Sequence, residues 1–141
     1  SYEPEQPVSV TTVEQRPEPI PVVEQSKPKE DKIVVEPMKQ NIFFALNSAR
    51  IQDEQQQKIS SLVEYLEKNP AAKICITGYA DVNTGNATIN FKLSEARAKN
   101  VAEALKSKGI AADRIKVDFK GDTVQPYSTP KENRVSICIT E

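Results

Sequence analysis

Proline divides this chain of 141 residues into two parts of different kinds. Seven of its ten Pro residues lie within the first 37 positions, where Glu and Gln are frequent and Gly is absent. Proline removes backbone donors and favours extended backbone, so such a segment cannot bury enough surface to offset its ordering entropy. We therefore expect residues 1–37 to be a semi-rigid linker and residues 38–141 to be one compact domain. Within the linker, KIVVE at 32–36 could form at most an edge strand, because Pro37 stops it.

The charges are divided in the same way. Residues 1–37 hold eight acidic and four basic side chains, whereas the rest of the chain is weakly basic. A weak excess of this kind is typical of an ordinary mixed surface, and we expect no nucleic-acid partner. The sequence contains no run of about 18 apolar residues that would indicate a membrane-spanning helix. Because the chain begins with Ser1 rather than Met, we expect that an upstream part has been removed.

The residue inventory limits the chemistry of the chain. It contains no His, which excludes a His general base and a His-ligated zinc site. Its two cysteines, Cys75 and Cys138, do not have the spacing of a zinc site or of a redox motif. We therefore expect no metal and no cofactor.

Apolar periodicity predicts six elements after the linker. Alternation indicates half-buried strands at 73–80 and 114–120, and 3–4 spacing indicates an amphipathic helix at 53–68 with Asp53 as its N-cap. The complete order is strand 38–46, helix 53–68, strand 73–80, helix 90–108, strand 114–120 and strand 134–140. In the last strand, alternation predicts that Val135, Ile137 and Ile139 point inward.

This order, β-α-β-α-β-β, predicts an α/β (α+β) two-layer sandwich. Strands that are joined through helices should be parallel with right-handed crossovers, and we expect the last strand to be antiparallel. Because only one face of each strand is strongly apolar, both helices should pack on the same face of a mixed four-stranded sheet. Gly109 should end the second helix, with Ile110 making the apolar contact that follows such an end.

The second helix carries an arginine where an apolar side chain is expected. On a helical wheel, Arg97 lies between Leu93 and Val101 in the apolar stripe. A buried guanidinium needs a carboxylate and further acceptors, because leaving it unpaired costs several kcal/mol. Asp81, at the carboxyl end of the preceding strand, is the local candidate, and open α/β sheets usually place ligands at that end.

Two interpretations of Asp81 and Arg97 are open at this point. They could form a plain ion pair that fastens the helix to the loop. Alternatively, the Asp could take an ammonium and the Arg a carboxylate in fork geometry, which together would suit a zwitterionic amino-acid head group. Asn90, near the predicted helix start, is either the N-cap or a polar contact beside free backbone amides that favour anions.

The segment GYADVNTGNATINFKLSEARA, residues 78–98, resembles the central signature of the OmpA-like peptidoglycan-binding domain family. That signature is a strand ending in G-H-x-D, a polar loop that contains Gly, and N-x-x-L-S-x-x-R-A. ENRVSICI near the end of the chain is similar to the family's N-R-x-V-x-I strand, and NIFF at 41–44 is similar to its opening strand. The similarity covers residues 39–141, and NIFFALNSARI resembles the version found in Bacteroidetes-type outer-membrane proteins.

The resemblance implies noncovalent binding of peptidoglycan through the diaminopimelate of its stem peptide. It assigns Asp81 to the diaminopimelate amine and Arg97 to its carboxylate. Asn90 and Leu93 match positions beside the ligand, and Arg134 matches a pocket-side arginine that precedes the last strand.

Three features depart from the family pattern. Ala45 follows the opening aromatic pair, where the family often has an acid, and Tyr79 replaces the usual His. The spacing from Asp81 to Arg97 is one residue longer than the family pattern. The acid and the arginine of the predicted clamp are both present.

The resemblance also suggests that the last strand lies antiparallel beside the second. By alternation, Cys75 and Cys138 are both expected on the face away from the helices. Since the periplasm permits disulfides, we favour a cross-strand bridge over two independent thiols.

We therefore expect a periplasmic wall-binding module that is part of an outer-membrane protein, anchored through an upstream barrel or lipid anchor, with residues 1–37 as the tether. A Pal-type lipoprotein or flagellar-stator module is the alternative, and a homodimer is left open.

An alternative of a different class is a wall-modifying enzyme. Glycoside cleavage usually needs two carboxylates about 5–9.5 Å apart, and amidases need zinc ligands or an activated nucleophile. Asp81 is the one acid of the predicted clamp and the chain has no His, so we expect no enzyme.

Overall fold

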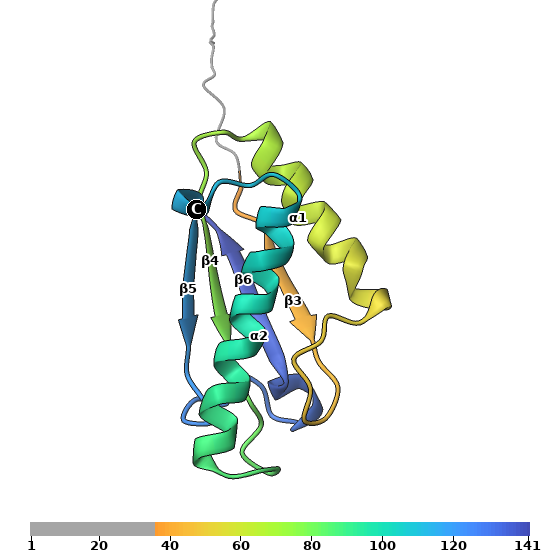
Figure 1. Ribbon diagram of the computed structural model, residues 1–141, viewed down its shortest axis with the longest axis vertical. Coiled ribbons are helices and arrows are strands. Elements are labelled where there is room, and N and C mark those ends of the chain that lie inside the picture. Colours follow the sequence, from red (N-terminus) through yellow and green to blue (C-terminus); the bar gives the residue numbers. More distant parts are fainter. Residues whose placement is uncertain (1–35) are drawn as a thin grey trace, which may run out of the picture. The chain divides into compact units, whose positions relative to one another are not determined.

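The computed structural model describes residues 36–141 (Figure 1). The linker prediction falls almost entirely outside these residues, as does the KIVVE strand. The described elements are β3 (Lys39–Phe43), α1 (Gln56–Lys68), β4 (Ile74–Gly78), α2 (Ala87–Ser107), β5 (Ile115–Phe119) and β6 (Val135–Thr140), with short 3-10 turns η3 (Asp53–Gln55), η4 (Ala112–Arg114) and η5 (Lys131–Asn133). No helix among them is long and apolar enough to cross a membrane.

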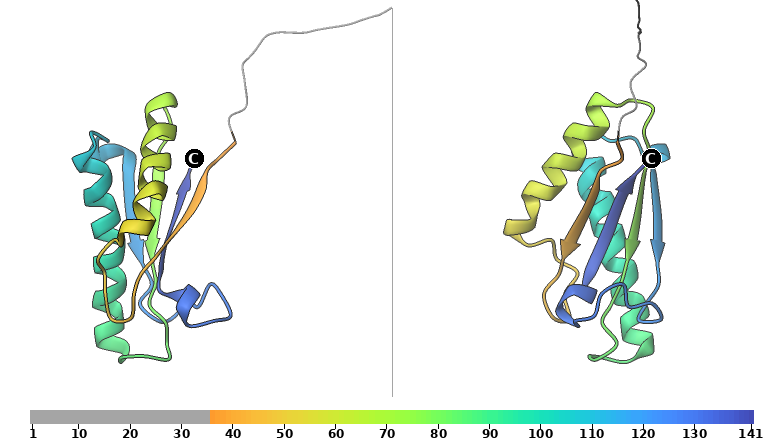
Figure 2. Two further views of the ribbon diagram at one scale, coloured as in Figure 1. Left: turned by 90° about the vertical axis from the view of Figure 1, so that its right-hand side faces the viewer. Right: turned by 180° about the vertical axis from the view of Figure 1, so that it is seen from behind.

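The four strands form one mixed sheet in the order β3-β6-β4-β5. β4 and β5 are parallel, and β6 runs antiparallel to both of its neighbours, β3 and β4. Both helices cover the same face of this sheet (Figure 2). The predicted two-layer sandwich and the antiparallel last strand are therefore confirmed.

The core lies between the two helices and the sheet. Fully buried aliphatic side chains of α1, α2 and β4 contribute roughly 1.5–3 kcal/mol each. They include Ile59, Leu62, Leu66, Ile74, Ile76, Val101 and Leu105. At Gly78 the sheet and α2 approach so closely that an added Cβ would collide with the carbonyl oxygen of Ser94. This close approach fixes where α2 crosses the end of β4.

The facing of β6 is the reverse of the sequence prediction. Cys138 pairs with Ile76 and belongs to the core beneath the helices, whereas Ile139 is 44% exposed on the other face. Val135 and Ile137 are buried on that other face because the 121–133 loop covers this end of it. Only small side chains of β6 face the helices, and its larger aliphatic ones lie on the other face, so apolar alternation alone indicated the wrong face.

The predicted disulfide between Cys75 and Cys138 is not formed, because the reversed facing of β6 places Cys138 on the helix side of the sheet. Cys138 is buried in the core, whereas Cys75 pairs with Ile139 and shares the opposite, outer face of the sheet. Both cysteines are free thiols. Because their side chains leave the sheet in opposite directions, they cannot form the expected bridge.

The structure confirms one predicted helix end and corrects two others. α2 begins three residues earlier than predicted, with Asn86 as its N-cap: its Oδ1 accepts a hydrogen bond from the Ile89 amide at 2.9 Å. At the other end Gly109 has a φ of 99°, and the Ile110 amide bonds to the Leu105 carbonyl, as predicted for a glycine-terminated helix. In the first helical segment, the residue preceding η3 is Gln52, so the N-cap prediction for Asp53 is wrong.

The outer edge of β3 is covered by side chains of the segment that follows it. Gln55 Oε1 accepts the amide hydrogen of Phe43 at 3.0 Å, and Lys58 Nζ donates to the carbonyl of Asn41. The Lys58 ammonium also lies 4.7 Å from the centre of the Phe43 ring. Two of the backbone groups that an edge strand would otherwise leave open, the Phe43 amide and the Asn41 carbonyl, are therefore already bonded.

Candidate functional site

Asp81 follows β4 and is almost completely buried, at 2% exposure. Its carboxylate accepts hydrogen bonds from the Asn83 amide at 3.1 Å and from the Thr84 hydroxyl, which lies 2.9 Å from each carboxylate oxygen. Arg134 completes the set, with its Nη1 3.2 Å from Oδ2 of Asp81. The acid is therefore held in one orientation by its own loop and by a cation 53 positions further along the chain.

Arg97 is completely buried, as its place in the apolar stripe predicted. Its guanidinium donates to three backbone carbonyls: Nε to Ser48 at 2.8 Å, Nη1 to Tyr79 at 2.9 Å and Nη2 to Ala45 at 3.3 Å. It also lies 5.4 Å from the centre of the Phe44 ring. Arg97 thus joins α2 to the end of β4 and to the segment after β3.

The electrostatics of Arg97 follow from this position. Burial lowers the pKa of Arg97 to about 10, repulsion by Arg134 acts in the same direction, and Asp81 opposes both. The guanidinium is therefore charged at neutral pH. The simple Asp81–Arg97 ion pair, one of the two sequence interpretations, is not formed, because Asp81 pairs with Arg134 and Arg97 bonds to carbonyls.

Asn90 is buried in the second turn of α2 and is not the N-cap. Its Nδ2 donates to the Thr84 carbonyl at 2.8 Å, to the Asp81 carbonyl at 3.3 Å and to the Asp122 carboxylate at 2.9 Å. One side-chain amide thus fastens the loop that contains Asp81 to the loop that follows β5. Of the predicted site residues, Asp81, Asn90, Arg97 and Arg134 belong to one connected cluster.

Leu93 lies beside this cluster. It lines a hollow of about 300 Å³ at the loop end of α2. The other lining residues are Leu46, Asn47, Thr84, Gly85, Ile89 and Asn90. Leu46 and Ile89 are 58% and 46% exposed, so the hollow offers an apolar surface next to the polar cluster.

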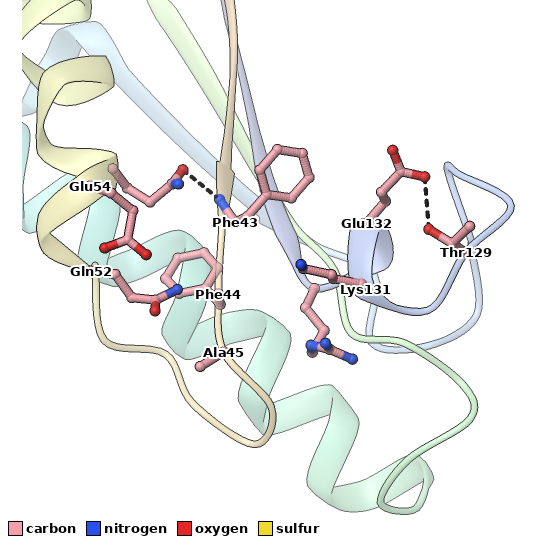
Figure 3. Close-up of a pocket in the computed structure, with 10 residues that line it drawn as sticks. Phe43, Phe44, Ala45, Gln52, Glu54, Thr129, Lys131 and Glu132 are labelled. Carbon is pink, nitrogen blue, oxygen red and sulfur yellow. Dashed lines mark hydrogen bonds between the residues drawn. The ribbon is translucent and has the colours of Figure 1, made fainter.

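A larger groove of about 810 Å³ lies beside the end of β3, at Phe43 and Phe44 (Figure 3). Its lining combines an aromatic surface with acids and bases: Phe43, Phe44, Ala45, Gln52, Glu54, Gln55, Thr129, Lys131, Glu132 and Arg134. Nε of Arg134 is buried and has no hydrogen-bond partner. Arg134 therefore contacts both Asp81 and the groove, with one donor still unused.

Several residues of this cluster were missed by sequence reasoning. Thr84 and Asp122 contact Asp81 and Asn90 directly, and Gln125 bonds to the backbone on both sides of Asp81. They lie in loops, where no periodicity indicates which way a side chain points. The spacing of Thr84 three residues after an acid is a weak local signal of a side-chain turn. Among residues 36–141, no group of three acidic or thiol side chains is arranged to hold a metal ion.

The sheet topology, with two helices on one face of a mixed four-stranded sheet, defines a class of small α/β domain. A solved structure of the peptidoglycan-associated lipoprotein from Burkholderia pseudomallei has the same fold, with a TM-score of 0.67 at 23% identity, over 72% of this chain and 89% of that one. The chain belongs to the OmpA family, which matches residues 43–136. The resemblance inferred from the sequence motifs is therefore confirmed.

Two curated relatives agree with this assignment. Outer membrane protein 40 of Porphyromonas gingivalis is 39% identical over 114 residues, which cover 81% of this chain and 29% of that protein. The peptidoglycan-associated lipoprotein of Legionella pneumophila is 30% identical over 91 residues, which cover 64% of this chain and 51% of that protein. The chain therefore spans less than a third of the first relative and about half of the second.

Proposed function

We propose that this domain binds peptidoglycan noncovalently through the diaminopimelate of the stem peptide and does no chemistry on it. It acts in the periplasm as part of an outer-membrane protein. Residues 1–37 are the linker between the domain and the membrane, and the protein so tethers the membrane to the wall. Family membership and relatives whose names include an outer-membrane protein and a peptidoglycan-associated lipoprotein support this proposal.

The observation that carries the proposal is the joining of one buried acid and two arginines at the carboxyl end of β4. Asp81 is paired with Arg134, and Arg97 bonds to the Tyr79 carbonyl two residues before Asp81. The free end of diaminopimelate carries an ammonium and a carboxylate on one carbon. An acid beside guanidinium groups is complementary to this pair of charges.

The contacts of Asp81 indicate how the ligand enters. The carboxylate already accepts bonds from Asn83, from Thr84 and from Arg134, which leaves little free acceptor capacity. A ligand ammonium must therefore displace a donor, and Arg134 is the donor that a second cation replaces without loss of charge balance. Once released, Arg134 can offer its guanidinium to the ligand carboxylate, together with its unpartnered Nε.

Arg97 has the second role in this proposal. A guanidinium has five N–H donors, and three of those of Arg97 are bonded to carbonyls. The remaining two are available to the ligand carboxylate only if the segment around Ala45 and Ser48 moves, because Arg97 is completely buried. Asn90 holds the loop in place, and Leu93 lines the apolar hollow beside which the aliphatic part of the ligand would lie.

Calorimetric titration of the domain with stem peptides tests the proposal. Peptides with diaminopimelate should bind more tightly than the lysine equivalents, because lysine keeps the distal amine but lacks the distal carboxylate. Asp81→Asn should weaken binding at least tenfold, whereas Asn69→Ala, which removes a side-chain bond to the Tyr65 carbonyl at the opposite end of the domain, should not. Equal binding of the two peptide types would refute diaminopimelate recognition. Release of fragments from purified wall would refute the noncatalytic assignment.

A further inference from the structure

Gln125, in the loop that follows β5, places its side-chain amide against the backbone on both sides of Asp81. Its Oε1 accepts a hydrogen bond from the Val82 amide at 3.1 Å, and its Nε2 donates to the Ala80 carbonyl at 2.9 Å. Ala80 and Val82 are the two chain neighbours of Asp81. The carboxamide therefore takes the place that a peptide group of an adjacent strand would occupy.

These two bonds, which we call the Gln125 bracket, continue the pairing of β4 with β5 beyond the last residue of either strand. The Ala80 amide donates to the Gly121 carbonyl at 3.0 Å, so the loop after β5 holds the backbone of Ala80 by two bonds and that of Val82 by one. Among side chains, only a carboxamide combines an N–H donor and a carbonyl acceptor in one planar group. The Gln125 side chain is long enough to place both the donor and the acceptor against the backbone on either side of Asp81.

The loop that carries Gln125 is itself fixed to α2. The Gly121 amide donates to the Ser94 hydroxyl at 2.8 Å, and the Asp122 carboxylate accepts from Asn90 at 2.9 Å. Nε2 of Gln125 also lies 3.2 Å from the Asp122 carbonyl, which orients the side chain within its own loop. The bracket is therefore anchored to the helix that carries Asn90 and Arg97.

We propose that Gln125 is the positioning residue of the binding site: it fixes the backbone of Asp81, and through it the direction of the carboxylate that takes the ligand ammonium. This inference rests on the proposed function of Asp81. Gln125 does not contact the ligand and acts only through Asp81. Its removal should reduce the amine-dependent part of binding and leave other contacts with the wall unchanged.

A double-mutant cycle measured by NMR titration with a diaminopimelate stem peptide tests the inference. Gln125→Leu, which keeps a side chain of similar bulk and removes both bonds to the neighbours of Asp81, should weaken binding about tenfold in the wild-type background. In an Asp81→Asn background the same change should have almost no effect, because the group through which Gln125 acts is gone. Asn69→Ala, which removes one side-chain bond to backbone far from Asp81, should leave the affinity at the wild-type value.

A second variant keeps the test decisive if Gln125→Leu does not fold. In Gln125→Glu, an ionised carboxylate faces the Ala80 carbonyl, whereas a protonated one restores the donor. The affinity ratio of wild type to Gln125→Glu should therefore fall towards one as the pH is lowered. The neighbouring acids Asp81 and Asp122 are present in both proteins, so the ratio compensates for their contribution.

The outcomes separate the two proposals. Failure of the wild-type domain to bind the diaminopimelate peptide overturns the proposed function. If the wild type binds but folded Gln125→Leu binds equally well, or if its effect persists in the Asp81→Asn background, the positioning role is wrong and the function stands. A pH-independent ratio for Gln125→Glu has the same meaning.

Discussion

Asp81 forms its ion pair with Arg134, 53 positions further along the chain, while Arg97, from the helix that directly follows the Asp81 loop, bonds to carbonyl groups instead. The two arginines therefore differ in role. Arg134 balances the charge of the acid and lines the large groove, whereas Arg97 holds three separate backbone segments together. Substitutions at the two positions should have different consequences.

Arg134→Gln should lower both stability and affinity. The change leaves the Asp81 carboxylate buried without a cation, which should reduce the free energy of unfolding by about 2–3 kcal/mol. The combination Arg134→Gln with Asp81→Asn should be more stable than the sum of the single changes predicts, because neither charge is then left alone. Urea unfolding of the four proteins measures this coupling, and additive effects would show that the pair contributes no stability.

Arg97→Lys should destabilise the domain by about 3 kcal/mol or more. An ammonium cannot reach the carbonyls of Ala45, Ser48 and Tyr79 together, and each buried acceptor that loses its donor costs about 1–3 kcal/mol. The exposed Arg50 provides the matched control, since Arg50→Lys should change stability by less than about 0.5 kcal/mol. If thermal unfolding shows the same small effect at both positions, the structural role of Arg97 is wrong.

Gly78→Ala should be strongly destabilising although the substitution adds one methyl group. The new Cβ would collide with the Ser94 carbonyl, so α2 would have to move away from β4 at a cost of about 3 kcal/mol. Gly109→Ala is the control, because a Cβ added there meets no atom within 4 Å. Its penalty of about 1 kcal/mol comes from the φ of 99° alone. Equal melting temperatures for the two variants would contradict the close approach of sheet and helix.

The buried thiol of Cys138 should make the domain less stable in alkali. Burial raises the pKa of Cys138 from 9.0 to about 12. Between these values the unfolded chain loses the proton and the folded chain keeps it, so stability falls as the pH rises above about 9, by about 1 kcal/mol at pH 10. Cys138→Ala should remove this part of the slope, while Cys75→Ala, which keeps the Cys138 thiol, should retain it. Melting temperatures from pH 8 to 10 measure the difference.

Local signals in the sequence predicted the elements and the buried position of Arg97. The glycine-terminated end of α2 was also predictable, because Gly109 and Ile110 act through backbone bonds of their own neighbourhood. The start of α2 was misplaced because Asn86 and Asn90 are both plausible caps by residue type, and only the bond from Ile89 to Asn86 distinguishes them. The linker assigned to residues 1–37 stays a prediction.

Apolar periodicity within a segment could not predict the contacts between segments that are distant in sequence. The facing of β6 depends on which side the 121–133 loop covers, and no pattern within VSICIT records that. The pairing of Asp81 with Arg134 and the bracket formed by Gln125 likewise join loops that are far apart in sequence. In the candidate site, the motif therefore indicated which residues gather, and the folded chain determines how they are bonded.

The covering of the β3 edge by Gln55 and Lys58 has a consequence for the self-association of the domain. A bare edge strand invites another polypeptide to add itself as a further strand, which is the first step of sheet-based aggregation. Here the Phe43 amide and the Asn41 carbonyl are already engaged by side chains of the same domain. A second copy of the domain therefore cannot add a strand to β3 through these two groups, which disfavours self-association by sheet extension at this edge.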